Sequence, residues 1–171
     1  MINPQLKKIG IIGPNTKRCS VQLYDFGVEL GRRIAQKDRV IVCGGRGGFM
    51  EAVCKGVKQS GDTFPGQTIG ILLGDTIEKA NPFVDVAIPT GIGIARNILI
   101  VRTADIIIAA GGGAGTLSEI AFAWELNKKV LCVTQFEGWA RELAGKNLDN
   151  RTSGLLIPVI NIEEILKYLE T

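Results

Sequence analysis

Residues 111–119 read Gly-Gly-Gly-Ala-Gly-Thr-Leu-Ser-Glu, a run whose composition and spacing suit anion binding. The apolar run 105–110 precedes it, and apolar residues at helical spacing follow it. A strand that ends in glycines and turns into a helix presents free backbone N–H groups at the positive end of the helix dipole. The sequence therefore predicts a site for a phosphorylated small molecule. The predicted phosphate-binding residues of this run are Gly112, Gly113, Ala114, Gly115 and Thr116.

Glu119 is the acid of this run, and its role has two interpretations. It lies three residues after Thr116, as in a capping box with Thr116 at the N-cap of a helix that starts near that residue. As a carboxylate beside a phosphate site, it also suits general acid or base chemistry. The glycines are likewise consistent with a structural corner alone.

Two arginines, Arg46 and Arg96, lie at positions where the local sequence pattern gives no structural reason for a positive charge. Arg46 stands between the glycine pairs 44–45 and 47–48, and it suits either a charge-assisted fork to a phosphate or a solvated loop. Arg96 lies in the first turn of an otherwise apolar helical pattern, where a cation opposes the helix dipole. Arg96 at this position is explained either by contact with the ligand or by an ion pair with Glu119. The other predicted ligand-binding residues are Gly13, Gly44, Gly45 and Gly47.

Composition narrows the chemistry further. The chain contains no histidine, which excludes Ser-His-Asp and Cys-His nucleophile systems and histidine general bases. Its four cysteines form no CxxC pair, so we expect no metal site and a reducing, cytoplasmic location. The formal net charge is only +3 and basic doublets such as 17–18 are scattered, which disfavours nucleic acid as a partner. No apolar run is long enough to span a membrane.

The elements that must position these residues alternate along the chain. Apolar runs predict strands at 9–12, 39–43, 68–73, 84–88, 105–110, 130–134 and 155–159, and helical spacing predicts helices at 23–34, 50–57, 94–103, 116–124 and 162–169. We expect one α/β domain over residues 1–171, a Rossmann-like doubly wound fold with a mostly parallel sheet covered by helices on both faces. The loops after successive strands then meet at one sheet edge, which makes the three glycine corners walls of one pocket.

Two familiar nucleotide motifs are absent. The dinucleotide fingerprint GxGxxG fails because Met50 and Thr116 stand where the third glycine of each candidate belongs. The phosphate loop GxxxxGK[ST] fails because Asn147 follows Gly145-Lys146. No lysine lies at the three glycine corners, which disfavours a Schiff base to pyridoxal phosphate.

Arg96, Asp105 nine residues later, and the run 112–119 together resemble the Lonely Guy family, often labelled "possible lysine decarboxylase", within a superfamily of nucleotide-binding Rossmann-like proteins. The resemblance spans essentially the whole chain, and residues 44–50 look like that family's GGGxxGxM corner. It implies catalytic roles for Arg96 and Glu119 in hydrolysing a nucleoside 5′-monophosphate to free base and ribose 5-phosphate, with no required cofactor. A carboxylate that stabilises oxocarbenium charge and orients water suits this reaction. The resemblance also implies a homodimer or higher homo-oligomer.

The chain departs from that pattern at Gly111, where the family has proline, and at residues 94–95, where Ile-Ala replaces His-Glu. The segments 90–97 and 111–119 are more similar to a branch that includes molybdenum-cofactor carrier proteins, which bind a phosphorylated pterin without turning it over. Two functions therefore stay open. One is a protein that binds a nucleotide-like phosphate ester and hydrolyses its N-glycosidic bond. The other is a non-catalytic carrier or sensor of a molybdopterin-type ligand.

Overall fold

The computed structural model describes residues 6–151 and 154–170. Within these ranges the strands are β1 (Lys7–Ile12), β2 (Arg39–Cys43), β3 (Thr68–Leu72), β4 (Val86–Pro89), β5 (Ile106–Ala110), β6 (Val130–Val133) and β7 (Leu156–Val159). The helices are α1 (Val21–Ile34), α2 (Phe49–Lys58), α3 (Asn97–Thr103), α4 (Ala114–Glu125), α5 (Trp139–Leu143) and α6 (Ile162–Leu169). Two 3-10 turns, η1 (Thr16–Arg18) and η2 (Gly93–Arg96), precede α1 and α3.

The seven strands form one sheet in the order β4-β3-β2-β1-β5-β6-β7, and every neighbouring pair is parallel. Strand order reverses at β1, which pairs with β2 on one side and β5 on the other. Ligands of open parallel sheets bind at the carboxyl ends of the strands beside such a reversal. The three glycine corners follow β1, β2 and β5, so the predicted fold and convergence are confirmed.

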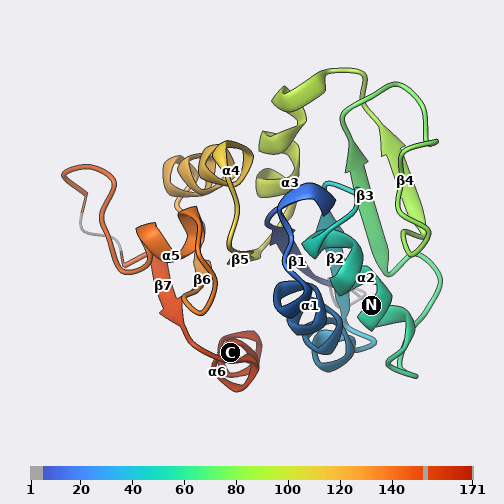
Figure 1. Ribbon diagram of the computed structural model, residues 1–171, viewed down its shortest axis with the longest axis horizontal. Helices are drawn as coiled ribbons and strands as arrows, with labels where there is room; N and C mark the ends of the chain where they lie inside the picture. Colours follow the sequence, from blue (N-terminus) through green and yellow to red (C-terminus); the bar gives the residue numbers. More distant parts are fainter. Residues whose placement is uncertain (1–5, 152–153, 171) are drawn as a thin grey trace, which may run out of the picture.

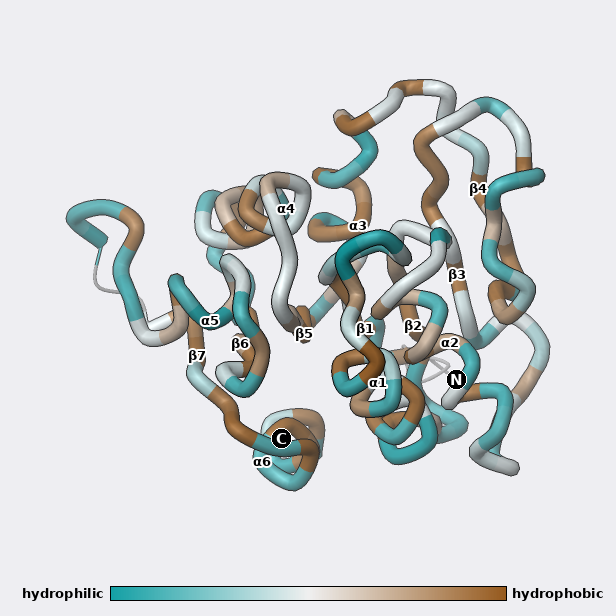
Figure 2. Tube along the Cα trace, in the orientation of Figure 1, coloured by the Kyte–Doolittle hydropathy of each residue, from teal (hydrophilic) through white to brown (hydrophobic). Residues whose placement is uncertain are grey.

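Helices cover both faces of the sheet (Figure 1). One buried cluster joins the sheet to α1, α2 and α6, and a second joins it to α3, α4 and α5. The strands are mostly apolar along their length, whereas the helices carry hydrophilic residues as well (Figure 2). Strand β5, and β2 after its first residue Arg39, read as continuous apolar runs because they are buried on both faces. No described helix is long and apolar enough to cross a bilayer.

Two predicted helices have different bounds in the structure, one further helix was not predicted, and all three differences affect the site. The α4 helix starts at Ala114, two residues before the predicted start. The predicted helix 94–103 is a 3-10 turn followed by α3, because Gly93 adopts a positive φ of 61° and opens the segment with a tight turn. The short α5 was not predicted, and its Trp139 and Ala140 N–H groups bond the carbonyls of Gly112 and Gly111 at 3.1 Å.

Candidate functional site

A cavity of 430 Å³ lies at the carboxyl ends of β1, β2 and β5. Its walls are the loop after β1, the loop after β2, the turn before α3 and the first turns of α4. The lining residues are Gly13, Pro14, Asn15, Lys17, Arg18, Arg46, Met50, Leu73, Ile94, Arg96, Asn97, Gly113, Ala114, Gly115, Thr116 and Glu119.

The ionisable lining is predominantly cationic. Lys17, Arg18, Arg46 and Arg96 line the cavity together with a single carboxylate, that of Glu119. A concave surface lined by charges of one sign raises the local concentration of the oppositely charged ligand. The cavity therefore favours an anion.

The N-terminus of α4 forms one wall of this cavity. Gly113 is the N-cap and no side chain caps the helix, and the first intrahelical bond at this end runs from Leu117 N to Gly113 O at 3.0 Å. The N–H groups of the first turn are consequently left for an outside acceptor. Arg18 adds its guanidinium above the same turn, since a Cβ built on Gly113 would lie 2.5 Å from Arg18 Nη1.

The capping-box interpretation of Glu119 is wrong. Because α4 begins at Ala114, Thr116 lies inside the helix and Glu119 is too far along to meet the helix start. The Glu119 side chain is instead buried in the cavity wall, with the residue only 6% exposed. Burial raises the pKa of Glu119 to about 7, although the charge of Arg96 acts in the opposite direction.

Arg96 faces Glu119 across the wall. Its Nη1 lies 3.4 Å from Glu119 Oε1 and donates to Asn97 Oδ1 at 2.8 Å. Burial lowers the pKa of Arg96. Its Nε has no partner among the described residues, and a Cβ on Gly44 would collide with its guanidinium. The ion pair predicted for Arg96 is thus present, and the same side chain also lines the cavity.

Asn97 connects this ion pair to the α4 N-terminus. Its Oδ1 accepts from Arg96, while its Nδ2 donates to Ser118 Oγ at 2.9 Å and to Gly115 O at 3.5 Å. Ser118 Oγ in turn donates to Gly115 O at 2.7 Å. One buried amide therefore fixes both the guanidinium and the first turn of the helix.

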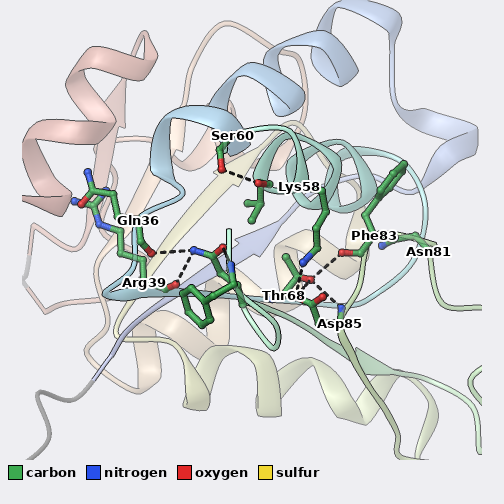
Figure 3. Close-up of polar contacts among 11 residues, drawn as sticks. Gln36, Arg39, Lys58, Ser60, Thr68, Asn81, Phe83 and Asp85 are labelled. Carbon is green, nitrogen blue, oxygen red and sulfur yellow. Dashed lines mark hydrogen bonds and ion pairs between the residues drawn. The ribbon is translucent and has the colours of Figure 1, made fainter. Parts of the chain in front are cut away.

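The Arg46 loop is held by Asn81, which is buried. Asn81 N donates to Gly45 O at 2.8 Å, and Asn81 Nδ2 donates to Arg46 O at 3.1 Å. The segment that carries Asn81 is itself anchored further on, where Asp85 accepts from Thr68 N and Oγ1 at 3.1 Å and pairs with Lys58 (Figure 3). The Arg46 backbone is therefore fixed, while its side chain bonds no described residue.

The structure brings most of the predicted site residues together. Those that line the cavity are Gly13, Arg46, Arg96, Gly113, Ala114, Gly115, Thr116 and Glu119. Four predicted glycines, Gly44, Gly45, Gly47 and Gly112, do not line it. They lie behind the wall, where an added Cβ would meet Arg96, Leu72, Thr16 and Thr116 respectively. These four positions have no room for a side chain, so glycine there allows the neighbouring residues to pack closely against the backbone.

Several lining residues were not predicted from the sequence. Lys17 and Arg18 have no predicted place in the site, but η1 places both in the cavity lining, so a lysine does lie beside a glycine corner. Their position within four residues of the Gly13-Pro14 turn was the available signal. Asp105, by contrast, lies at the opposite end of β5, where it accepts from Lys8 N at 2.8 Å. Asp105 fixes the start of β5 against β1 and is remote from the cavity.

The chain belongs to the SLOG cluster4 family, whose model matches residues 6–166. This family lies within the Lonely Guy-like group of Rossmann folds, so the predicted resemblance is confirmed. Among solved structures, the structural-genomics target TM1055 is 33% identical, with a TM-score of 0.86, 96% of this chain and 99% of that chain covered.

Two further solved structures carry functional descriptions. A molybdenum cofactor binding protein from the phototrophic bacterium Rippkaea orientalis is 31% identical, with a TM-score of 0.81 and coverage of 99% of this chain and 100% of that chain. The molybdenum cofactor carrier protein of Chlamydomonas reinhardtii is 27% identical, with a TM-score of 0.81 and 97% of each chain covered.

Proposed function

We propose that this member of the SLOG cluster4 family binds a phosphorylated pterin of the molybdenum-cofactor type and carries it without chemical change. The uncapped N-terminus of α4, with Arg18 above it, is the observation that carries the proposal. Backbone N–H groups and a guanidinium in this arrangement suit the terminal phosphate of such a ligand. The cavity volume of 430 Å³ falls within the range typical of sites for small molecules.

The rest of the cavity suits the ring system. Asn97, Glu119 and Arg96 offer hydrogen-bond donors and acceptors on the wall, while Met50 and Leu73 provide apolar contact area. Fused heterocycles such as pterins need both kinds of contact. The solved structures described as a molybdenum cofactor binding protein and a molybdenum cofactor carrier protein support this choice of ligand.

The test is direct loading of the protein. Cofactor released from a denatured molybdoenzyme under anaerobic conditions is mixed with the protein, unbound cofactor is removed by gel filtration, and retained pterin is oxidised and measured by fluorescence. We expect retention by the wild type and its loss in Gly115→Leu, because the added side chain lies in the cavity. A Cβ at Gly115 meets nothing within 4 Å, so the fold tolerates the change. Equal retention by the two proteins would contradict the proposal.

A second candidate function, N-glycosidic hydrolysis, is favoured by the pairing of Glu119 with Arg96. A carboxyl group whose pKa is about 7 exists in both protonation states near neutral pH. In its ionised form it stabilises oxocarbenium charge while water adds to the sugar carbon, and the water proton passes to the departing base. Incubation with nucleoside 5′-monophosphates and chromatography for free base tests this function. Release by the wild type and none by Glu119→Gln would establish it over the carrier function.

We also propose that the protein self-associates in the cytoplasm. Ile92 is 51% exposed on the turn before α3, a degree of apolar exposure that a second copy would cover. The thiols of Cys19, Cys43, Cys54 and Cys132 are all unbridged, as in a reducing compartment. Light scattering on the wild type and on Ile92→Asp tests the association, and a monomeric wild type would refute it.

A further inference from the structure

A second cavity of 260 Å³ adjoins the main one at Arg46 and Leu73, which line both. Its other lining residues come from the end of β3 and the loop that follows. They are Leu72, Gly74, Asp75, Thr76 and Lys79. We call this space the side cavity. Arg46 thus stands at the boundary between two spaces.

The walls of the side cavity are tied to the rest of the site by hydrogen bonds. Gly93 N donates to Leu73 O and Gly91 N donates to Gly74 O, each at 2.9 Å. Thr90 Oγ1 donates to Leu72 O at 2.7 Å. These bonds join the loop after β3 to the segment that leads into Arg96. The two cavities therefore share one framework.

The polar side chains that line the side cavity have no hydrogen-bond or ion-pair partner among the described residues. Arg46, Asp75, Thr76 and Lys79 make no side-chain hydrogen bond or ion pair with any residue in the ranges 6–151 and 154–170. Two cations, a carboxylate and a hydroxyl beside two leucines form a set that suits a polar ligand with an apolar face. Asp75, Thr76 and Lys79 are exposed and Arg46 is half-buried, so their polar groups are accessible to such a ligand.

We propose that the side cavity holds the second half of a two-part ligand, a nucleotide whose phosphate is joined in a diphosphate linkage to the phosphate of the group bound in the main cavity. Arg46 would bind the diphosphate bidentately at the boundary, with Lys79 beyond it. Asp75 and Thr76 would bond the ribose hydroxyls or the base, and the leucines would contact the ring. This inference rests on the proposed function, because the first phosphate must occupy the main cavity.

The sizes of the two cavities support a ligand with two halves. The main cavity alone accommodates a single small phosphate ester, so a monophosphate does not need the side cavity. A dinucleotide-type ligand needs additional space with an anion-binding group at the joint. The side cavity and Arg46 provide these two features at adjacent positions.

The experiment compares AMP with diadenosine diphosphate, which adds a second AMP half at nearly unchanged total charge. Isothermal titration calorimetry should show the dinucleotide binding wild-type protein about 10-fold more tightly, equivalent to about 1.4 kcal/mol. Gly74→Leu should abolish this advantage and leave AMP affinity unchanged, because Gly74 lines the side cavity and a Cβ there meets no protein atom within 4 Å. Gly115→Leu, the matched change in the main cavity, should weaken both ligands.

Lys79→Gln provides a second variant that adds no bulk and should reduce the dinucleotide advantage by about 3-fold. Equal wild-type affinity for the two ligands would overturn the inference and leave the proposed function standing. A dinucleotide advantage that persists in Gly74→Leu, with melting curves that show the variant folded, would overturn it as well. If neither AMP nor the dinucleotide binds the wild type, the inference falls, whereas the proposed function is judged separately by the cofactor-loading experiment.

Discussion

Arg96 Nη1 and Glu119 Oε1 lie 3.4 Å apart in the wall of the main cavity, although 23 residues separate them in the chain. Both residues are only 6% exposed. Burial disfavours the charged form of each side chain, which lowers the pKa of Arg96 and raises that of Glu119. The attraction between the two charges shifts each pKa in the opposite direction. This balance leaves the carboxyl group able to titrate near neutral pH, and it governs the first two predictions.

Stability should fall as pH rises through neutrality. The folded pKa of Glu119 is about 7, against an ordinary value of 4.5, so its stabilising contribution is fully present below pH 4.5 and is lost as pH rises through 7. The expected decrease in the free energy of unfolding is ~3 kcal/mol. Urea titrations between pH 4.5 and 8 measure it. Glu119→Gln should remove this pH dependence, whereas Glu125→Gln, on the exposed side of the same helix, should retain it.

Removal of one partner of the ion pair should cost more than removal of both. Arg96→Leu leaves the Glu119 carboxylate buried without its cation, and we expect a loss of about 3 kcal/mol at pH 8. The double variant with Glu119→Leu should recover at least half of that loss, because no buried charge remains. A double-mutant cycle in urea quantifies the coupling. Additive losses would mean that the pair does not interact.

Two adjacent glycines should respond differently to alanine. Gly112 has a φ of 91° and a Cβ there would collide with Thr116, so Gly112→Ala should lower stability by ~2 kcal/mol or more. At Gly113 an added Cβ meets only the guanidinium of Arg18, which is free to move. Gly113→Ala should therefore cost only ~0.5–1 kcal/mol, the loss expected for alanine at an N-cap, but weaken AMP binding. Thermal melts and calorimetry separate these two effects.

Asn97 should affect both stability and binding. Asn97→Ala removes the acceptor of Arg96 and the donor to Ser118, so we expect a loss of ~1–3 kcal/mol together with weaker AMP binding. Ser118→Ala removes only one of these contacts and leaves Arg96 in place. It should cost less than ~1 kcal/mol and preserve affinity. If the two variants bind AMP equally, Asn97 does not position the guanidinium.

Much of the fold is predictable because its signals are local. Each strand of the sheet is a short apolar run, and glycines mark the exits of β1, β2 and β5. Parallel connections then bring those exits to one edge regardless of sequence detail. The α5 helix escaped prediction because it has only five residues and is stabilised by Gly111 and Gly112, which are distant along the chain. The start of α4 was misplaced because Gly113, rather than a polar side chain, is its N-cap.

The sequence by itself determined the alternation of strands and helices, the glycine-rich strand-to-helix corner at residues 111–116 and the candidacy of Arg96 and Glu119, because these depend on short-range spacing. Only the tertiary structure decided that Glu119 pairs with Arg96 instead of capping α4, that Lys17 and Arg18 line the cavity, and that Arg46 stands between two cavities. These features join segments tens of residues apart. Their geometry is fixed by the order of strands in the sheet, which no local pattern encodes.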